Sequence, residues 1–297
     1  MRPADSVRAL PRRVADRVGA YGGFVPAAGL LGVFFAVPLV LIVCYSLWTV
    51  VDYEVVRTWS FGNYDYIFGV PSYLRTLVAT FAVGAIVTAI DLVIAFPVAY
   101  WLARYVPDRW QRLLLALLVV PFLSSYLLRV YAWVTILDTN GIVNGFLRTV
   151  GLIDEPLTLL YTRPSVVVVL VYLYFPFAVL TLYAPLRRFD WDQLKAAMDL
   201  GASPAGAIRR ILLPQIRPGI TTAAIFVFVP VLGEYLVPQI VGGTDGVMYG
   251  NVIATFFQGG EYTRGAAAAM LVTIVIVALL LLFRRSLELR GSDATRG

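Results

Sequence analysis

The chain has 297 residues, of which 60% are hydrophobic and only 14% are charged, and its formal net charge is +6. Because soluble domains carry about 25% charged residues, this composition excludes an ordinary soluble globular protein and indicates a chain that lies in a lipid bilayer. Histidine is absent and the single cysteine is Cys44, which excludes an intrachain disulfide, histidine-ligated metal sites and Ser–His or Cys–His nucleophilic centres.

The chain also lacks the GxxxxGK[ST] and GxGxxG fingerprints of nucleotide-binding loops. We therefore expect no catalytic residues, no metal site and no cofactor bound by this chain. If ATP drives its function, another protein hydrolyses the ATP.

Runs of about 20 apolar residues recur along the chain, and this is the length at which a helix crosses a hydrocarbon core of roughly 30 Å. They predict an all-α membrane protein with six transmembrane helices, at about residues 24–50, 77–103, 113–136, 165–186, 219–241 and 265–283. The first run is too long for a signal peptide and no small-residue cleavage site follows it, so we expect it to be retained. The predicted organisation is a leader (1–22), a six-helix transmembrane domain (23–283) and a tail (284–297).

Most Lys and Arg residues lie in four segments: the leader, the loop between the second and third spans, the loop between the fourth and fifth spans, and the tail. Positive residues stay on the cytoplasmic side during insertion. We therefore expect both termini to be cytoplasmic. The net charge is a topology signal, and we expect no nucleic-acid partner.

Two ionisable residues lie within the second and third predicted spans. Asp91 has no basic residue within a helical turn, so its partner lies on another helix, in water or on a transported solute. The alternative is a protonated aspartate that hydrogen-bonds to a neighbouring helix. Arg129 lies near the outer end of the third span, from where its side chain can extend outward to the membrane interface.

The three predicted outer loops, 51–76, 137–164 and 242–264, differ in composition: the first two carry several acidic residues and the last is rich in glycine. They are either docking surfaces for a soluble partner or simple solvated connections.

The cytoplasmic loop at about 188–218 has the signals of a helix–turn–helix. Asp190 or Asp192 can cap a short helix, and Gly201 suits the left-handed position that ends it. Ser203 followed by Pro204 then starts a second helix.

The first of these short helices places Leu194, Ala197 and Met198 at helical spacing. We predict that this face lies across the cytoplasmic side and binds another protein.

The same loop resembles the EAA loop of permease subunits of ATP-binding-cassette (ABC) importers, the MetI-like family, in which Glu-Ala-Ala is followed by Gly and then Ile-x-Leu-Pro. Lys195 occupies the position of the family's glutamate. The resemblance implies a type I importer permease fold and contact with a dimer of cytoplasmic ATPases. It assigns this coupling role to Lys195, Ala196, Ala197, Gly201, Ile211, Leu213 and Pro214.

Further segments are similar to the first permease subunit of spermidine/putrescine importers, among them FPVAYWLAR (96–104), PFLSSYLLRVYAW (121–133) and VPVLGEYLVPQIVGG (229–243). This resemblance implies a multi-pass protein of the bacterial inner membrane, surrounded by lipid. It also implies a second permease subunit and an extracytoplasmic solute-binding protein as partners. Lys195 favours a heterodimer, because two unlike permeases would tolerate one degenerate coupling loop.

The fifth span contains the strongest candidate for cargo binding. Glu234 lies between Pro230 and Pro238, beside Gly233, where an interrupted helix frees carbonyl groups and lets a carboxylate face a cavity. Carboxylate and aromatic groups suit the ammonium groups of a polyamine. The predicted substrate path comprises Glu234, Tyr235, Asp91, Tyr172, Tyr174 and Tyr183. Alternatively, Glu234 caps the broken helix or pairs with a basic residue of the partner subunit.

Two other classes of protein fit less well. Half of a secondary transporter would explain the hydropathy but not the capped loop, and a membrane enzyme would need clustered acidic or histidine residues. We therefore predict a non-enzymatic permease subunit of an ABC importer for polyamines. The alternative cargoes are an amino acid, an inorganic anion or ferric ion.

Overall fold

The computed structural model describes residues 24–51 and 54–291. The predicted leader and the last six residues of the predicted tail lie outside this range. Within it, five helices are long and apolar enough to cross a membrane, or six if a pair of helices with a 90° bend between them is counted as one span. The prediction of an all-α membrane protein is confirmed.

The elements follow in chain order. They are α2 (Phe24–Leu47), β1 (Thr49–Val51), β2 (Glu54–Val56), α3 (Gly62–Gly69), α4 (Pro71–Arg104), α5 (Asp108–Val119), the 3-10 turn η1 (Val120–Leu123), α6 (Tyr126–Leu137), α7 (Ile142–Thr149), α8 (Arg163–Arg188), α9 (Asp192–Asp199), α10 (Pro204–Ala207), the π-helical turn η2 (Ile208–Leu212), α11 (Leu213–Leu232), α12 (Leu236–Val241), α13 (Tyr249–Gln258) and α14 (Tyr262–Gly291). The two strands form an antiparallel pair in which Val50 lies opposite Val55.

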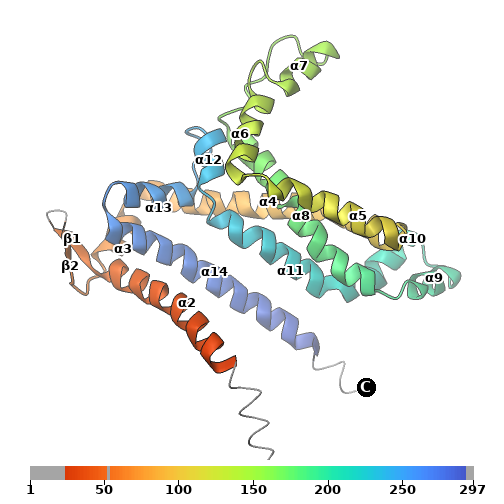
Figure 1. Cartoon of the computed structure of the whole chain (residues 1–297), viewed down its shortest axis with the longest axis horizontal. Helices are drawn as coiled ribbons and strands as arrows, with labels where there is room; N and C mark the ends of the chain where they lie inside the picture. Colours follow the sequence, from red (N-terminus) through yellow and green to blue (C-terminus); the bar gives the residue numbers. More distant parts are fainter. Residues whose placement is uncertain (1–23, 52–53, 292–297) are drawn as a thin grey trace, which may run out of the picture.

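Helices α4, α8 and α11 form the centre of the molecule, and each contacts the other two (Figure 1). Their contact surfaces are built from small and β-branched side chains with no exposed area, such as Ala95, Val169 and Val227, which allow helices to approach closely in a membrane. Gly219 on α11 marks the closest approach, since a Cβ atom there would lie 2.5 Å from Cγ of Pro185 on α8.

Helix α2 lies at the periphery, alongside α14 (Figure 1). Only 6% of its apolar window is buried, and Phe34 and Phe35 are 74% and 72% exposed. Such a surface is stable only in a hydrocarbon environment.

The predicted third span, 113–136, is wrong as a single helix. Helix α5 passes through η1 and ends, and the chain turns by 90° before it continues through α6 and α7. Pro121 lacks an N–H for a helical hydrogen bond, Ser124 adopts an extended backbone conformation, and Ser125 is also non-helical. Helices α6 and α7 therefore form an arm that projects from the bundle (Figure 1).

The three predicted outer loops contain short helices: α3, α7 and α13 lie in 51–76, 137–164 and 242–264, respectively. Helix α4 also begins earlier than predicted, with Pro71 in its first turn, a position that suits the fixed backbone of proline. Helix α14 continues to Gly291, into the predicted tail.

Candidate functional site

The first candidate region is the loop around α9. The turn after this helix follows the predicted signals, but the predicted cap does not form, because the N-cap position is Trp191 and no side chain caps it. The Asp190 carboxylate accepts a hydrogen bond from the backbone N–H of Asp192 at 3.1 Å. Gly201 has φ +92°, the left-handed conformation that the sequence predicted. The Ser203 hydroxyl accepts a hydrogen bond from the backbone N–H of Gly206 at 3.2 Å, with Pro204 in the first turn.

The second half of the predicted helix–turn–helix is not a separate helix. Residues Pro204–Leu232 form one continuous helical segment. Pro214 has no N–H to donate, and the helix widens to a π turn immediately before it, in which the N–H of Leu213 bonds to the carbonyl of Ile208. Ile211, Leu213 and Pro214 thus lie in the N-terminal part of a long candidate membrane-spanning helix. Only α9 is a separate short helix in this loop.

The predicted outward face of α9 is wrong at one position. Leu194 is only 5% exposed and belongs to the core of its own chain. The exposed apolar residues are Met198, at 39%, and Leu200, at 90%. Leu200 was not predicted as part of this surface. It lies at the end of α9, directly before the left-handed Gly201, so it does not belong to the buried face of the helix.

Lys195 forms an ion pair on the surface of α9. Its Nζ lies 2.7 Å from Oδ1 of Asp192, and both side chains are exposed. The hydrogen bond and the charge of Lys195 lower the pKa of the Asp192 carboxyl group. The alanines beside it are exposed Ala196 and half-buried Ala197. Their small side chains allow another protein to approach this surface closely.

The second candidate region is the break between α11 and α12, formed by Gly233, Glu234 and Tyr235. Oε1 of Glu234 accepts hydrogen bonds from the backbone N–H groups of Leu236 at 2.9 Å and Val237 at 3.3 Å. The carboxylate therefore caps α12, where the positive end of the helix dipole favours a negative charge. Capping the broken helix is one of the two alternatives to cargo binding that the sequence left open for Glu234.

The other carboxylate oxygen of Glu234 binds two tyrosines from other helices. The hydroxyl of Tyr126 on α6 donates to Oε2 at 2.6 Å, and that of Tyr174 on α8 donates at 3.5 Å. Glu234 thus joins α12 to α6 and α8. Tyr126 is not part of the predicted substrate path. The available signal was its position directly after Ser124 and Ser125, where the helix that contains Pro121 ends.

The remaining tyrosines of the predicted path do not reach the carboxylate. Tyr172 is exposed and packs edge-on against Trp133, with ring centroids 5.3 Å apart. Tyr183 lies about 13 Å further along α8 than Tyr174 and donates to Oε1 of Gln111 at 2.6 Å. Tyr235 is 45% exposed and points its backbone carbonyl at Nδ2 of Asn251, at 2.8 Å.

Asp91 lies apart from this cluster, inside the bundle. It has no exposed area, and neither carboxyl oxygen has a hydrogen-bond partner among the described residues. The interhelical hydrogen bond expected for it is thus not present within the described part of the chain. A solute does not reach Asp91 in this conformation.

Arg129 does not extend outward as predicted. Its guanidinium lies over the ring of Phe122, with 4.5 Å from Cζ to the ring centroid, and 5.7 Å from the ring of Tyr126. Nε and Nη1 are buried and have no hydrogen-bond partner among the described residues. Cation–π contact with these two rings holds the side chain at the bend between η1 and α6.

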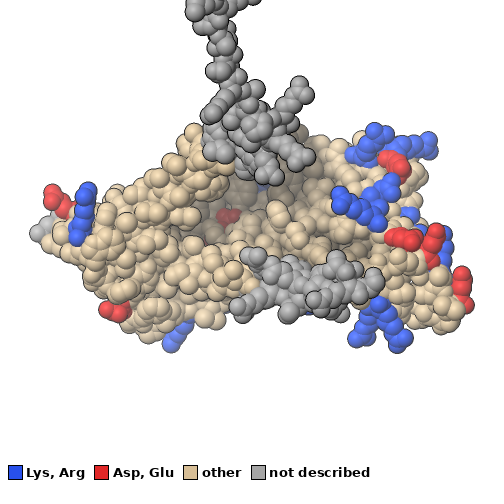
Figure 2. All heavy atoms as spheres, turned by 90° about the horizontal axis from the view of Figure 1, so that it is seen from below, with Lys and Arg blue, Asp and Glu red and all other residues tan. Residues whose placement is uncertain are grey.

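The arrangement provides a negative charge inside an otherwise apolar surface. Among the described residues no cluster of acidic or cysteine side chains could hold a metal ion. On the face seen in Figure 2, charged residues gather mainly at the end of the molecule that carries α9, and few are visible in the middle. The hydrogen-bond donors on the Glu234 carboxylate are all uncharged, so they leave it without a counter-charge and suited to bind a cation.

Comparisons with known proteins agree with this geometry. Residues 65–290 match the family described as binding-protein-dependent transport system inner membrane component. The spermidine/putrescine transport system permease protein PotB of Escherichia coli (strain K12) is 35% identical over 234 residues, which is 78% of this chain and 84% of that protein.

Solved structures share the fold at low sequence identity. A bacterial ABC transporter that imports the polysaccharide alginate matches with a TM-score of 0.70 at 16% identity, over 92% of this chain and 98% of the other. A bacterial alginate ABC transporter solved in complex with an alginate pentasaccharide-bound periplasmic protein also gives a TM-score of 0.70 at 16% identity, over 91% of this chain and 94% of the other. The MetNI methionine ABC transporter gives 0.54 at 18% identity, over 72% and 94%.

The predicted type I importer permease fold is confirmed by these matches, as is a multi-pass protein of the inner membrane. The chain belongs to the family of inner membrane components of binding-protein-dependent transport systems, the permease subunits of ABC importers.

Proposed function

We propose that this chain forms part of the translocation path of an ABC importer for polyamines such as spermidine and putrescine. The observation that carries the proposal is the Glu234 carboxylate at a helix break, held by backbone and tyrosine donors and by no cation among the described residues. The similarity to PotB supports the same cargo class.

A polyamine ammonium group would bind Glu234 by replacing one of the hydrogen-bond donors that now contact the carboxylate. Tyr174 makes the longest of the four hydrogen bonds, at 3.5 Å, so its loss costs least. The exposed ring of Tyr235 lies next in sequence and offers a face for the cation.

The α9 end of the bundle faces the cytoplasm in this proposal, and both termini lie on that side. Exposed Leu200 and Met198 form the apolar part of the contact with a dimer of ABC ATPases, which bind and hydrolyse ATP. This chain contributes no catalytic residue and holds no cofactor.

A second permease subunit and a solute-binding protein complete the importer. The solved alginate transporter, which shares the fold, was captured with its periplasmic protein. We expect the corresponding protein to dock at the opposite end from α9, where α3, α13 and the strand pair lie (Figure 1).

Uptake of labelled putrescine and spermidine tests the proposal. Cells that lack this chain should lose energy-dependent uptake, and the wild-type chain should restore it. Gly201→Asp should not, because it disrupts the coupling loop.

If uptake is unchanged in cells without any second polyamine system, the polyamine assignment is wrong. The permease function would then apply to another small solute, namely an amino acid, an inorganic anion or ferric ion.

A further inference from the structure

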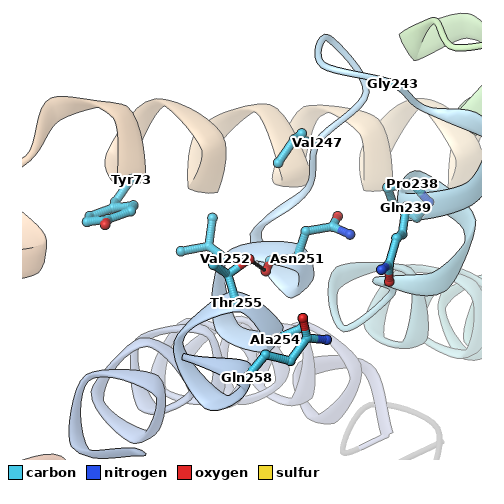
Figure 3. A pocket seen from close by; sticks show the side chains of 10 residues that line it. All are labelled: Tyr73, Pro238, Gln239, Gly243, Val247, Asn251, Val252, Ala254, Thr255 and Gln258. Carbon is cyan, nitrogen blue, oxygen red and sulfur yellow. Dashed lines mark hydrogen bonds between the residues drawn. The ribbon is translucent and has the colours of Figure 1, made fainter. Parts of the chain in front are cut away.

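A cavity of about 400 Å³ lies between α12, α13 and the beginning of α4 (Figure 3). Its volume falls within the range of small-molecule sites, about 300–1,000 Å³. It lies at the opposite end of the bundle from α9 (Figure 1), which is the end that receives solute in the proposed orientation.

The lining of this cavity is mostly apolar, with several polar side chains and no formal charge. Gln239 projects from α12, Asn251, Thr255 and Gln258 project from α13, and the ring of Tyr73 closes it on the α4 side (Figure 3). Amide and hydroxyl oxygens accept hydrogen bonds from ammonium groups. Apolar surface between them, contributed by residues such as Val247 and Val252, suits methylene groups.

The cavity is joined to the Glu234 break through Asn251. Oδ1 of Asn251 accepts a hydrogen bond from the backbone N–H of Met248 at 3.0 Å, and its Nδ2 donates to the carbonyl of Tyr235 at 2.8 Å. This side chain is therefore fixed at both ends. It forms part of the cavity wall and holds the residue that follows Glu234.

Close contact of the backbones reinforces this junction. A Cβ atom on Gly250 would lie 2.5 Å from the carbonyl oxygen of Glu234. A side chain at this position would push α13 away from the break, so the first turn of α13 and the Glu234 peptide pack directly together.

We propose that this cavity, the α12–α13 cavity, is a receiving site in which a protonated linear amine is held before it reaches Glu234. This inference rests on the proposed function. Uncharged acceptors hold an ammonium group weakly, and transfer along a path requires sites that release their solute. The Glu234 carboxylate, at the N-terminal end of α12, is then the next site along the path.

Cysteine labelling in membrane vesicles that contain the complete importer tests the receiving site. Cys44 is the only cysteine, so Cys44→Ser gives a background for Gln258→Cys, with Thr255→Cys as a second reporter one turn away. Spermidine without binding protein should slow thiol modification at both positions several-fold. The uncharged 1,4-butanediol should not.

Asn140→Cys is the matched control, because Asn140 is an exposed amide residue outside the cavity, between α6 and α7. Its labelling should be indifferent to spermidine. Equal protection of Asn140→Cys and Gln258→Cys would overturn the inference, since it would mean general screening of charge rather than a site. Absence of protection at both cavity positions would overturn it as well.

Two variants of Gln258 with opposite charges give a second measurement, in which the expected effects have opposite directions. In the Thr255→Cys reporter, Gln258→Glu should lower the half-protecting concentration of spermidine about five-fold at low salt, and Gln258→Lys should raise it. Equal values for the two variants would contradict the inference. If the wild-type importer transports no polyamine at all, the proposed function fails; if it transports polyamine and labelling is unaffected, only the receiving site fails.

Discussion

A carboxylate inside a membrane-spanning region needs hydrogen-bond donors, and Glu234 has four within 3.5 Å. Two of them come from the backbone of α12 and two from tyrosines of other helices. The same side chain therefore stabilises the fold and carries the negative charge of the site.

Glu234→Gln separates these two roles. The amide oxygen can still cap α12, so we expect the amount of protein in the membrane and its thermal unfolding temperature to stay close to wild type. Polyamine uptake should fall at least about ten-fold, because the ion pair between the ammonium group and the Glu234 carboxylate is replaced by a weaker hydrogen bond to an uncharged amide. Uptake close to wild type would restrict Glu234 to helix capping.

Tyr126→Phe provides the complementary change. It removes a 2.6 Å hydrogen bond to a charged group, a type of bond worth about 1.5–3 kcal/mol. We expect a lower thermal unfolding temperature, since α6 loses its link to α12. Tyr172→Phe is the matched control, because Tyr172 is exposed and has no hydrogen bond to Glu234; an equal loss in both variants would contradict a specific role for Tyr126.

Asp91 gives the opposite expectation. A buried carboxylate without partners would be very costly if ionised, so a neutral side chain should replace it readily. Asp91→Asn should retain uptake within about two-fold and fold normally. Loss of uptake in a well-folded Asp91→Asn protein would show that the charge of Asp91 is needed in another conformation.

At the scale of the elements, the end of α9 depends on one backbone conformation. Gly201 has φ +92°, and a Cβ atom added there would meet no other atom within 4 Å, so Gly201→Ala tests backbone strain alone, at about 1–2 kcal/mol. We expect weaker co-purification of the ATPase and slower uptake. Gly145→Ala is the control, because Gly145 is equally uncrowded but lacks a positive φ; matching effects of the two changes would rule out the strain argument.

The contact between α8 and α11 should be equally sensitive. A Cβ atom at Gly219 meets the rigid ring of Pro185, so Gly219→Ala must push the two helices apart and should cost about 1–3 kcal/mol. The measurement is the thermal unfolding temperature in detergent. Gly32→Ala on α2 places its methyl group in open space and should have no destabilising effect.

Local signals predicted the turn after α9 well, because the left-handed Gly201 and the Ser203 cap each depend on a few adjacent residues. The partners of Glu234 could not be predicted in this way. Tyr126 is 108 positions away in sequence, and the turn that brings it there breaks a run whose apolar composition predicted a straight helix. Leu194 was misplaced for the same reason: helical spacing identifies a face but does not show what covers it.

At the scale of the whole molecule, the apolar surface indicates partners that a single chain does not provide. Besides α2, side chains such as Leu123 and Leu128, at 84% and 66% exposed, lie on the segment that carries Arg129. An affinity tag on this chain should co-purify an ATPase and a second, different permease subunit. Recovery of a complex with two copies of this chain and no other permease would contradict the heterodimer that Lys195 led us to expect.

The pairing of α2 with α14 also has a consequence for biosynthesis. Residues 48–261 are made between these two helices, which takes roughly 10–40 s at a synthesis rate of about 5–20 residues per second. Throughout that time α2 resides in the bilayer without its main contact, and its apolar, charge-free sequence makes this stable. The bundle therefore closes only when the last span has been inserted, so a ribosome that stalls before α14 leaves an open intermediate for membrane quality control to remove.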